Sequence, residues 1–190
     1  MKIEFFFDFG SPAAYLAWTQ LPRLQAAGEV EMRPMLLGAV FKATGNASPA
    51  QVKAKGDWLM DDLRRWAARY GVPLKLPRNF PVNTIAPMRG AAALEGDERF
   101  SLYVKTVFEA IFGRGEDISE PEVLRAALKG VGLDAKAILG SMTAEPVKKK
   151  LKETTEEAVF RGVFGAPTFF VGEEMHFGND RIDWVIRAAS

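Results

Sequence analysis

The chain has 190 residues, 48% of them hydrophobic, which is enough for a sizeable core in one domain or in one domain with a large insertion. Lys and Arg (25) nearly balance Asp and Glu (24), so no overall field attracts nucleic acid or an acidic membrane. The chain has no cysteine and one histidine, which excludes disulfides and cysteine catalysis and disfavours a metal site. No signal peptide or membrane span is recognisable, and we expect a cytoplasmic protein.

An apolar stretch rich in phenylalanine lies at residues 3–9 and ends at Gly10-Ser11-Pro12. A near-continuous apolar run of this length predicts a strand buried on both faces, inside a sheet covered by helices. Ser11 is a preferred N-cap residue and the proline suits the first helical position, so we expect a helix over residues 13–25. Free amide groups and the helix dipole would let Ser11 stabilise an anion, although a plain capping role is the alternative.

A second strand is predicted at residues 29–36, which completes a strand, helix and strand unit with two parallel strands. Residues 38–45 are expected to form a loop or short helical turn that carries Lys42. A lysine just past the carboxyl end of a strand could reach a ligand in the crevice there, or could simply be solvated. Both interpretations stay open from the residues alone.

The middle of the chain is predicted to be all helical. Ser48-Pro49 has the form of a helix start, and this helix runs to residues 70–71 with a break at residues 55–56. Asn83 begins the next helix, residues 83–95, as its N-cap, and a role in ligand binding is the lesser alternative. Further helices are expected at residues 97–112, at 119–128 with a capping box from Ser119 to Glu122, at 134–141 with Asp134 as cap, and at 144–161.

The pattern changes at residues 162–172, where a turn bounded by glycine leads through a proline into an apolar strand. A tight turn at residues 173–174 and a short strand at residues 175–177 follow. Asn179 or Asp180 is expected to cap a C-terminal helix. The C-terminal part of the chain is therefore predicted to be two antiparallel strands and a helix.

The order of elements is βαβ, then helices, then ββα. This order indicates an α/β protein with a thioredoxin-like fold that is interrupted by a large all-helical insertion. We expect residues 1–37 and 156–190 to form the thioredoxin-like domain and residues 38–155 the helical insertion domain. In such a fold the turn after the first strand faces the turn before the third strand, which would place Ser11 opposite Pro167.

We also predict a cis peptide bond between Ala166 and Pro167. A cis-proline would leave the N–H and C=O of the preceding residue free to pair with an extended, peptide-like ligand. Because the chain has no cysteine, any thiol must come from outside, and the Ser11 hydroxyl can only donate a hydrogen bond to it. Such a donor favours the thiolate over the thiol.

Four motifs along the whole chain resemble those of the 2-hydroxychromene-2-carboxylate isomerases, bacterial relatives of the kappa-class glutathione transferases. The motifs keep their order and spacing, and together they are specific. They lie at Asp8-Phe9-Gly10-Ser11-Pro12 with Tyr15-Leu16-Ala17, at residues 37–46, at residues 161–169 and at residues 177–181.

The resemblance implies a homodimeric enzyme that depends on glutathione. Ser11 would stabilise the glutathione thiolate, and the backbone at Ala166, before Pro167, would pair with the cysteinyl part of glutathione. Gly178-Asn179-Asp180 would hold the γ-glutamyl end. Ala166 stands where the family has a valine, but a backbone contact survives that change.

The resemblance further implies that Lys42 and Asn83 line the pocket of a small aromatic substrate, with Lys42 facing a carboxylate. The implied reaction interconverts 2-hydroxychromene-2-carboxylate and trans-o-hydroxybenzylidenepyruvate in the catabolism of naphthalene-type compounds, and glutathione is regenerated.

Three other functions remain as alternatives. A kappa-class-like transferase or peroxidase would use the same Ser11 but consume glutathione. A non-catalytic thioredoxin-fold binding module, or a cysteine-less relative of disulfide oxidoreductases, would show no such turnover. A hydrolase that pairs Ser11 with His176 is the weakest alternative, because the G-x-S-x-G elbow is missing.

Overall fold

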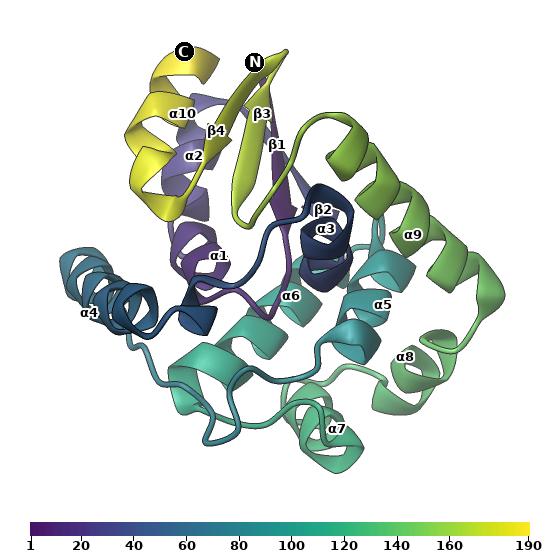
Figure 1. Ribbon diagram of the computed structural model, residues 1–190. Coiled ribbons are helices and arrows are strands. Elements are labelled where there is room, and N and C mark those ends of the chain that lie inside the picture. Colours follow the sequence, from purple (N-terminus) through teal and green to yellow (C-terminus); the bar gives the residue numbers. More distant parts are fainter.

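The computed structural model describes residues 1–190, and a four-stranded mixed sheet lies at its centre (Figure 1). The strands are β1 (Lys2–Phe7), β2 (Glu29–Pro34), β3 (Thr168–Val171) and β4 (Glu174–Phe177), and their order in the sheet is β2-β1-β3-β4. β1 pairs in parallel with β2 and antiparallel with β3, while β3 pairs antiparallel with β4. The predicted βαβ and ββα halves are confirmed.

Helices make up the rest of the fold. They are α1 (Pro12–Trp18), α2 (Leu21–Ala27), α3 (Leu37–Thr44), α4 (Lys53–Tyr70), α5 (Ile85–Leu94), α6 (Phe100–Phe108), α7 (Pro121–Gly130), α8 (Ala135–Ser141), α9 (Glu145–Phe160) and α10 (Ile182–Ala189), with the short helices η1 (Pro49–Gln51), η2 (Glu109–Arg114) and η3 (Asn179–Arg181). Helices α2 and α10 contact each other and the sheet on one side, and α9 contacts β2 with α3 beside it. Helices α5 to α8 gather at the end of the molecule away from both termini (Figure 1), which confirms the large helical insertion.

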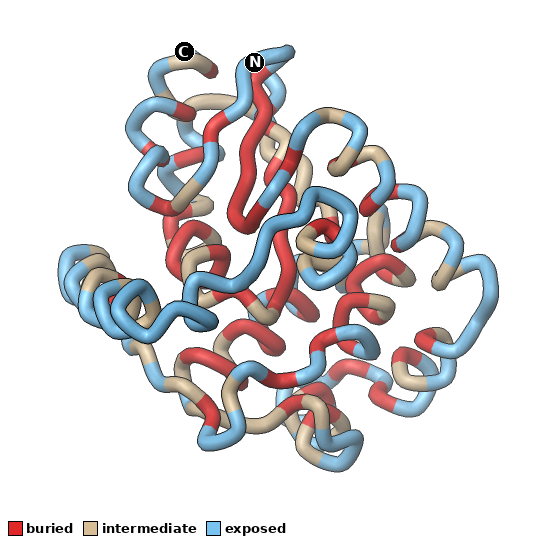
Figure 2. Tube along the Cα trace, in the orientation of Figure 1, coloured by how far each residue is buried: buried red, intermediate tan, exposed pale blue.

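β1 is a central strand that is buried on both faces, as the sequence predicts. Ile3 and the three phenylalanines from Phe5 to Phe7 are fully buried, and the N-terminal strand is red in Figure 2. The ring of Phe5 stacks on that of Phe169, its partner on β3, with 4.7 Å between the ring centroids. Full burial of one such side chain contributes about 1.5–3 kcal/mol, so this strand anchors the core.

The predicted helix over residues 13–25 is wrong, because the structure divides it into α1 and α2. Pro22 lies at the second position of α2 and has no N–H to donate to a helical carbonyl, so it fits the start of a new helix and not the middle of a longer one. Residues 38–45 are expected from the sequence to form a loop or a short helical turn, and the structure has the two-turn helix α3 at Leu37–Thr44. The break expected at residues 55–56 occurs earlier, at Val52, between η1 and α4.

Several predicted caps are also wrong. Ser119 does not cap α7: its hydroxyl donates to Asp117, and Glu120 occupies the N-cap position without a side-chain bond. Neither Asn179 nor Asp180 caps α10, because both belong to the preceding 3-10 turn η3. A side-chain cap forms only when the chain direction before the helix allows it, and that direction is set by tertiary packing.

The division into residues 1–37 with 156–190 and residues 38–155 stays a prediction. Helix α9 spans its second boundary, and one cluster of 43 buried residues runs through both parts. None of the helices combines the length and the apolar character that crossing a bilayer requires.

Candidate active site

Ser11 joins the two turns that the sequence predicts to face each other. Its Oγ accepts the N–H of Ala14 at 3.1 Å, which makes Ser11 the N-cap of α1, and it donates to the carbonyl oxygen of Ala166 at 2.8 Å. Only 5% of Ser11 is exposed. The two hydrogen bonds bring together the start of α1 and the turn before β3, which lie 155 residues apart in the chain.

The peptide bond between Ala166 and Pro167 is cis, as predicted. The carbonyl of Ala166, which we expected to be free for a ligand, instead accepts the hydroxyl of Ser11. The N–H of the buried Ala166 donates no hydrogen bond within the chain. Of the two backbone groups expected to pair with a ligand, the donor is therefore available and the acceptor is held by the serine.

The turn after β4 lies against the same proline. The N–H of Gly178 donates to the carbonyl of Pro167 at 3.0 Å, and Gly178 has a φ of 106°, a left-handed conformation that favours glycine. Asn179 is 6% exposed, its backbone carbonyl accepts the Tyr70 hydroxyl at 2.9 Å, and its side-chain Nδ2 is buried without a partner. Asp180 is exposed, and its carboxylate lies 3.6 Å from the guanidinium of Arg181. The structure thus groups the predicted glutathione residues at one end of the sheet, after β1, before β3 and after β4.

Lys42 and Asn83 are not held in this group by any hydrogen bond. Lys42 lies exposed in the last turn of α3 and forms no ion pair. Asn83 is also exposed, and its Oδ1 accepts the N–H of Ile85 at 3.0 Å, although Thr84 holds the N-cap position of α5. The side chains of both predicted substrate residues therefore face solvent.

Asp8 is a central residue of this region to which the sequence interpretation gave no role. It is 3% exposed, and its carboxylate accepts from the Gly10 N–H at 2.8 Å, the Thr84 hydroxyl at 2.7 Å and the Leu37 N–H at 2.8 Å. Burial raises the pKa of the Asp8 carboxyl, and the three donors oppose that rise only in part. An acidic residue directly after a buried strand and three positions before Ser11 was the available signal.

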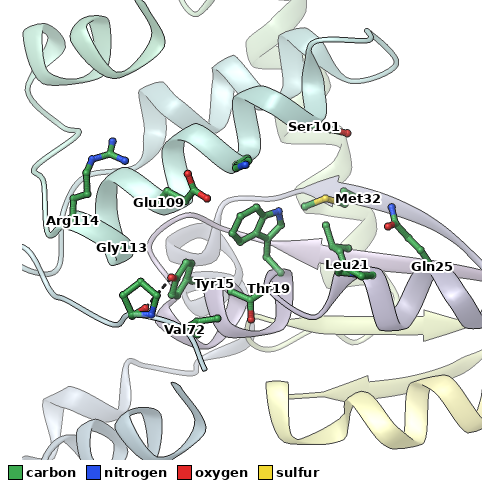
Figure 3. Close-up of a pocket in the computed structure, with 14 residues that line it drawn as sticks. Tyr15, Thr19, Leu21, Gln25, Met32, Val72, Ser101, Glu109, Gly113 and Arg114 are labelled. Carbon is green, nitrogen blue, oxygen red and sulfur yellow. Dashed lines mark hydrogen bonds between the residues drawn. The ribbon is translucent and has the colours of Figure 1, made fainter. Parts of the chain in front are cut away.

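A separate cavity lies between α1, α2, α6 and η2 (Figure 3). Its volume is about 660 Å³, and none of the predicted site residues lines it. Tyr15 and Trp18 of α1 line it, and the Tyr15 hydroxyl donates to the carbonyl of Pro73 at 2.8 Å. Burial, followed by the nearby charge of Glu109, raises the pKa of Tyr15. Helix α1 thus presents its N-cap to the Ala166 turn and a different face to this cavity.

The sheet order, the helical insertion and the serine turn opposite a proline turn define a protein of the thioredoxin-fold class. The chain belongs to the family of DSBA-like thioredoxin domains, whose model matches residues 2–188.

Among curated proteins, the chain is 35% identical to 2-hydroxychromene-2-carboxylate isomerase of Sphingobium xenophagum over 189 residues, which cover 96% of this chain and 95% of that protein. It is 30% identical to glutathione S-transferase kappa 1 of Rattus norvegicus, with 95% and 87% covered. Among solved structures, a 2-hydroxychromene-2-carboxylate isomerase superposes with a TM-score of 0.87 at 33% identity, covering 99% of this chain and 94% of that one. The isomerase and kappa-transferase resemblance predicted from the motifs is confirmed.

Proposed function

We propose that this protein is a glutathione-dependent isomerase that interconverts 2-hydroxychromene-2-carboxylate and trans-o-hydroxybenzylidenepyruvate in the catabolism of naphthalene-type compounds. The observation that carries the proposal is the hydrogen bond from Ser11 to Ala166, beside the unpaired N–H of Ala166. It supports a site for a peptide-like thiol that is built without any cysteine of the chain. The full-length similarity to proteins named as this isomerase supports the choice of reaction.

The residues at the site fit glutathione. The Nδ2 of Asn179 is buried without a partner, and an unpaired buried donor costs about 1–3 kcal/mol. The N–H of Ala166 is a second donor without a hydrogen bond in the chain. Glutathione is a peptide with carbonyl and carboxylate acceptors that would satisfy both. The Asp180 carboxylate, exposed at the rim, suits the ammonium group of the γ-glutamyl end. Ser11, Ala166, Pro167 and the turn at residues 178–180 would hold this cofactor.

When bound, glutathione supplies a thiolate nucleophile that is regenerated at the end of the isomerisation. Ser11 can turn its O–H from the Ala166 carbonyl toward that thiolate while its oxygen continues to accept the N–H of Ala14. A hydrogen bond to a charged group is worth about 1.5–3 kcal/mol, which lowers the pKa of the thiol by roughly one to two units. Helix α1 has only seven residues, so the hydroxyl contributes more than the helix dipole.

Lys42 and Asn83 would hold the substrate. The ammonium group of Lys42 is exposed and free of ion pairs, so it is available for the substrate carboxylate. Asn83 has its Oδ1 engaged with the N–H of Ile85, which leaves the amide NH₂ as its donor to a substrate oxygen. The protein is proposed to work as a homodimer, as the resemblance implies.

A kappa-class-like transferase is the second candidate, favoured by the 30% identity to the rat kappa enzyme over nearly the whole chain. It would use the same serine and consume one glutathione per substrate. The deciding experiment follows 2-hydroxychromene-2-carboxylate by absorbance with and without glutathione, and titrates free thiol before and after. Glutathione-dependent turnover with constant thiol supports the isomerase; loss of thiol in step with an electrophile supports the transferase. If the protein binds no glutathione, both proposals are wrong.

A further inference from the structure

The carboxylate of Asp8 connects three separate segments of the chain. One oxygen, Oδ1, accepts both the Gly10 N–H of the serine turn and the hydroxyl of Thr84 at the start of α5. The other oxygen, Oδ2, accepts the N–H of Leu37, the first residue of α3. No lysine or arginine pairs with this buried carboxyl group.

Each of the three segments carries one residue of the proposed site. Gly10 precedes Ser11, α3 carries Lys42 in its last turn, and Thr84 follows Asn83. The backbone N–H of Ser11 also donates to the carbonyl of Asp8 at 3.0 Å. One buried side chain therefore fixes the distance between the thiol-binding turn and both segments assigned to the substrate.

The N-terminus of α3 depends on Asp8 for its position. Leu36, at its N-cap position, makes no side-chain cap bond, and the free N–H of Leu37 is capped instead by Asp8 from across the fold. The hydroxyl of Thr155 on α9 accepts the N–H of Leu36 at 3.0 Å, and the N–H of Met35 donates to the carbonyl of Phe7 at 3.0 Å. These two bonds anchor the residues before α3, whereas the Asp8 carboxylate accepts the first N–H of the helix itself.

We propose that Asp8 is a positioning residue that holds α3 and the start of α5 against the Ser11 turn, so that the bound thiolate and the bound substrate meet at a fixed separation. The inference rests on the proposed function, and it assigns Asp8 no contact with substrate or glutathione. Misplacement of reacting groups by about 1 Å costs roughly a hundredfold in rate, so a tether of this kind controls turnover more than ligand affinity.

The first test is Asp8→Asn. In either orientation of the asparagine amide, its NH₂ group faces one backbone N–H, which is itself a donor. Either the Leu37 N–H of α3 or the Gly10 N–H of the serine turn therefore loses its hydrogen bond to residue 8. We expect kcat/KM for the isomerisation to fall by roughly ten- to a hundredfold, with unchanged near-ultraviolet circular dichroism. Amide hydrogen exchange should become faster in residues 9–11 or in residues 37–40.

The second test removes only the Leu37 N–H and remains informative if Asp8→Asn does not fold. Leu37→Pro places proline at the first position of α3, where it is tolerated, and the extended φ and ψ of Leu36 (−92° and 102°) suit a residue before proline. Leu37→Ala is the matched control, because it also shortens the side chain but keeps the N–H. Compared with that control, Leu37→Pro should lower kcat by roughly tenfold, with a glutathione Kd within about threefold.

The outcomes separate this inference from the proposed function. If the wild-type protein shows no glutathione-dependent turnover, the proposed function is wrong. The positioning role of Asp8 is then tested by the amide hydrogen exchange measurements alone. Equal kinetic constants for Leu37→Pro and Leu37→Ala in an active protein would overturn the positioning role. Unchanged exchange in both segments of a folded Asp8→Asn protein would overturn it as well.

Discussion

Ser11→Ala is the substitution that tests the proposed chemistry most directly. The alanine removes one oxygen atom and both of its hydrogen bonds, the cap to the N–H of Ala14 and the bond to the carbonyl of Ala166. No other contact of the turn needs to change, because Gly10 and the backbone of residue 11 stay bonded to Asp8. The consequences for stability and for activity can therefore be worked out separately.

The stability change follows from the two lost bonds. Loss of an N-cap side chain costs about 1 kcal/mol, and the Ala166 carbonyl, left buried without its donor, adds about 1–3 kcal/mol. The free energy of unfolding should fall by about 2–4 kcal/mol, from a total that is typically 5–15 kcal/mol for a protein of this kind. The variant should thus remain folded, with a lower urea midpoint.

The change in activity should be larger than the loss of stability explains. Without the hydroxyl, the thiolate loses a charge-assisted hydrogen bond of about 1.5–3 kcal/mol, so kcat/KM should fall by roughly ten- to a hundredfold and the pKa of bound glutathione should rise by one to two units. The assays are isomerisation kinetics in the fully folded range and titration of the thiolate by its ultraviolet absorbance.

Thr168→Val provides the matched control. Its buried hydroxyl donates to the carbonyl of Gly165 at 2.8 Å in the same loop, so this substitution also leaves a buried carbonyl unpaired. It should lower stability to a similar degree and change kcat/KM by no more than about twofold. The argument for Ser11 is refuted if Ser11→Ala retains wild-type kcat/KM, or if both variants lose activity equally.

Three further predictions test other parts of the structure. Because Lys42 is exposed, Lys42→Met should change the free energy of unfolding by no more than about 0.5 kcal/mol. It should raise the substrate KM roughly two- to fivefold, and this rise should be smaller at high salt, which screens an exposed charge. An unchanged KM would show that Lys42 does not contact the substrate. Burial opposes ionisation of Glu4, but Arg161 and a second arginine outweigh it and hold its pKa below the ordinary range. The stabilisation of the folded state by ionised Glu4 is therefore present above the unfolded-state pKa and is lost as the pH falls through the folded-state pKa. Glu4→Gln should lower the free energy of unfolding by about 1–3 kcal/mol at neutral pH and leave it unchanged in strong acid. Urea unfolding of both proteins as a function of pH checks this. Gly90→Ala should destabilise by about 1–3 kcal/mol, because its Cβ would collide with the buried side chains of Tyr103 on α6 and Met142 just after α8. Gly140→Ala meets open space and should be neutral or stabilising by up to about 1 kcal/mol, and equal urea midpoints for the two variants would contradict this.

Part of the site was predictable because its signals are local. Ser11 and the proline after it mark a helix start through the conformations of adjacent residues, and the structure has this cap. The apolar run of β1 required burial on both faces wherever the sheet lay. The order of elements, interpreted as a thioredoxin-like fold, added the prediction that Ser11 faces the turn before β3, which periodicity and propensity alone do not contain.

Local signals failed where tertiary packing competes with them. Ser119 has the spacing of a capping box, but Asp117 takes its hydroxyl instead. Asn83 is a good N-cap residue, yet its neighbour Thr84 occupies that position because Asp8 fixes the Thr84 hydroxyl. Only the folded chain determines which of several adequate partners a polar side chain finds.

The sequence by itself determined the βαβ and ββα halves, the helical middle and the serine at the first turn, since each depends on residues that are neighbours in the chain. Only the tertiary structure decided that the Ser11 hydroxyl is bonded to the Ala166 carbonyl, 155 residues away. It also decided that the Asp8 carboxylate accepts hydrogen bonds from Leu37 and Thr84, which lie 29 and 76 positions further along the chain. The physical reason is that such hydrogen bonds depend on strand register and helix placement within about 3 Å. The positions of the strands and helices are determined jointly by many apolar contacts between residues distant in the chain, and no single stretch of sequence contains both partners of these contacts.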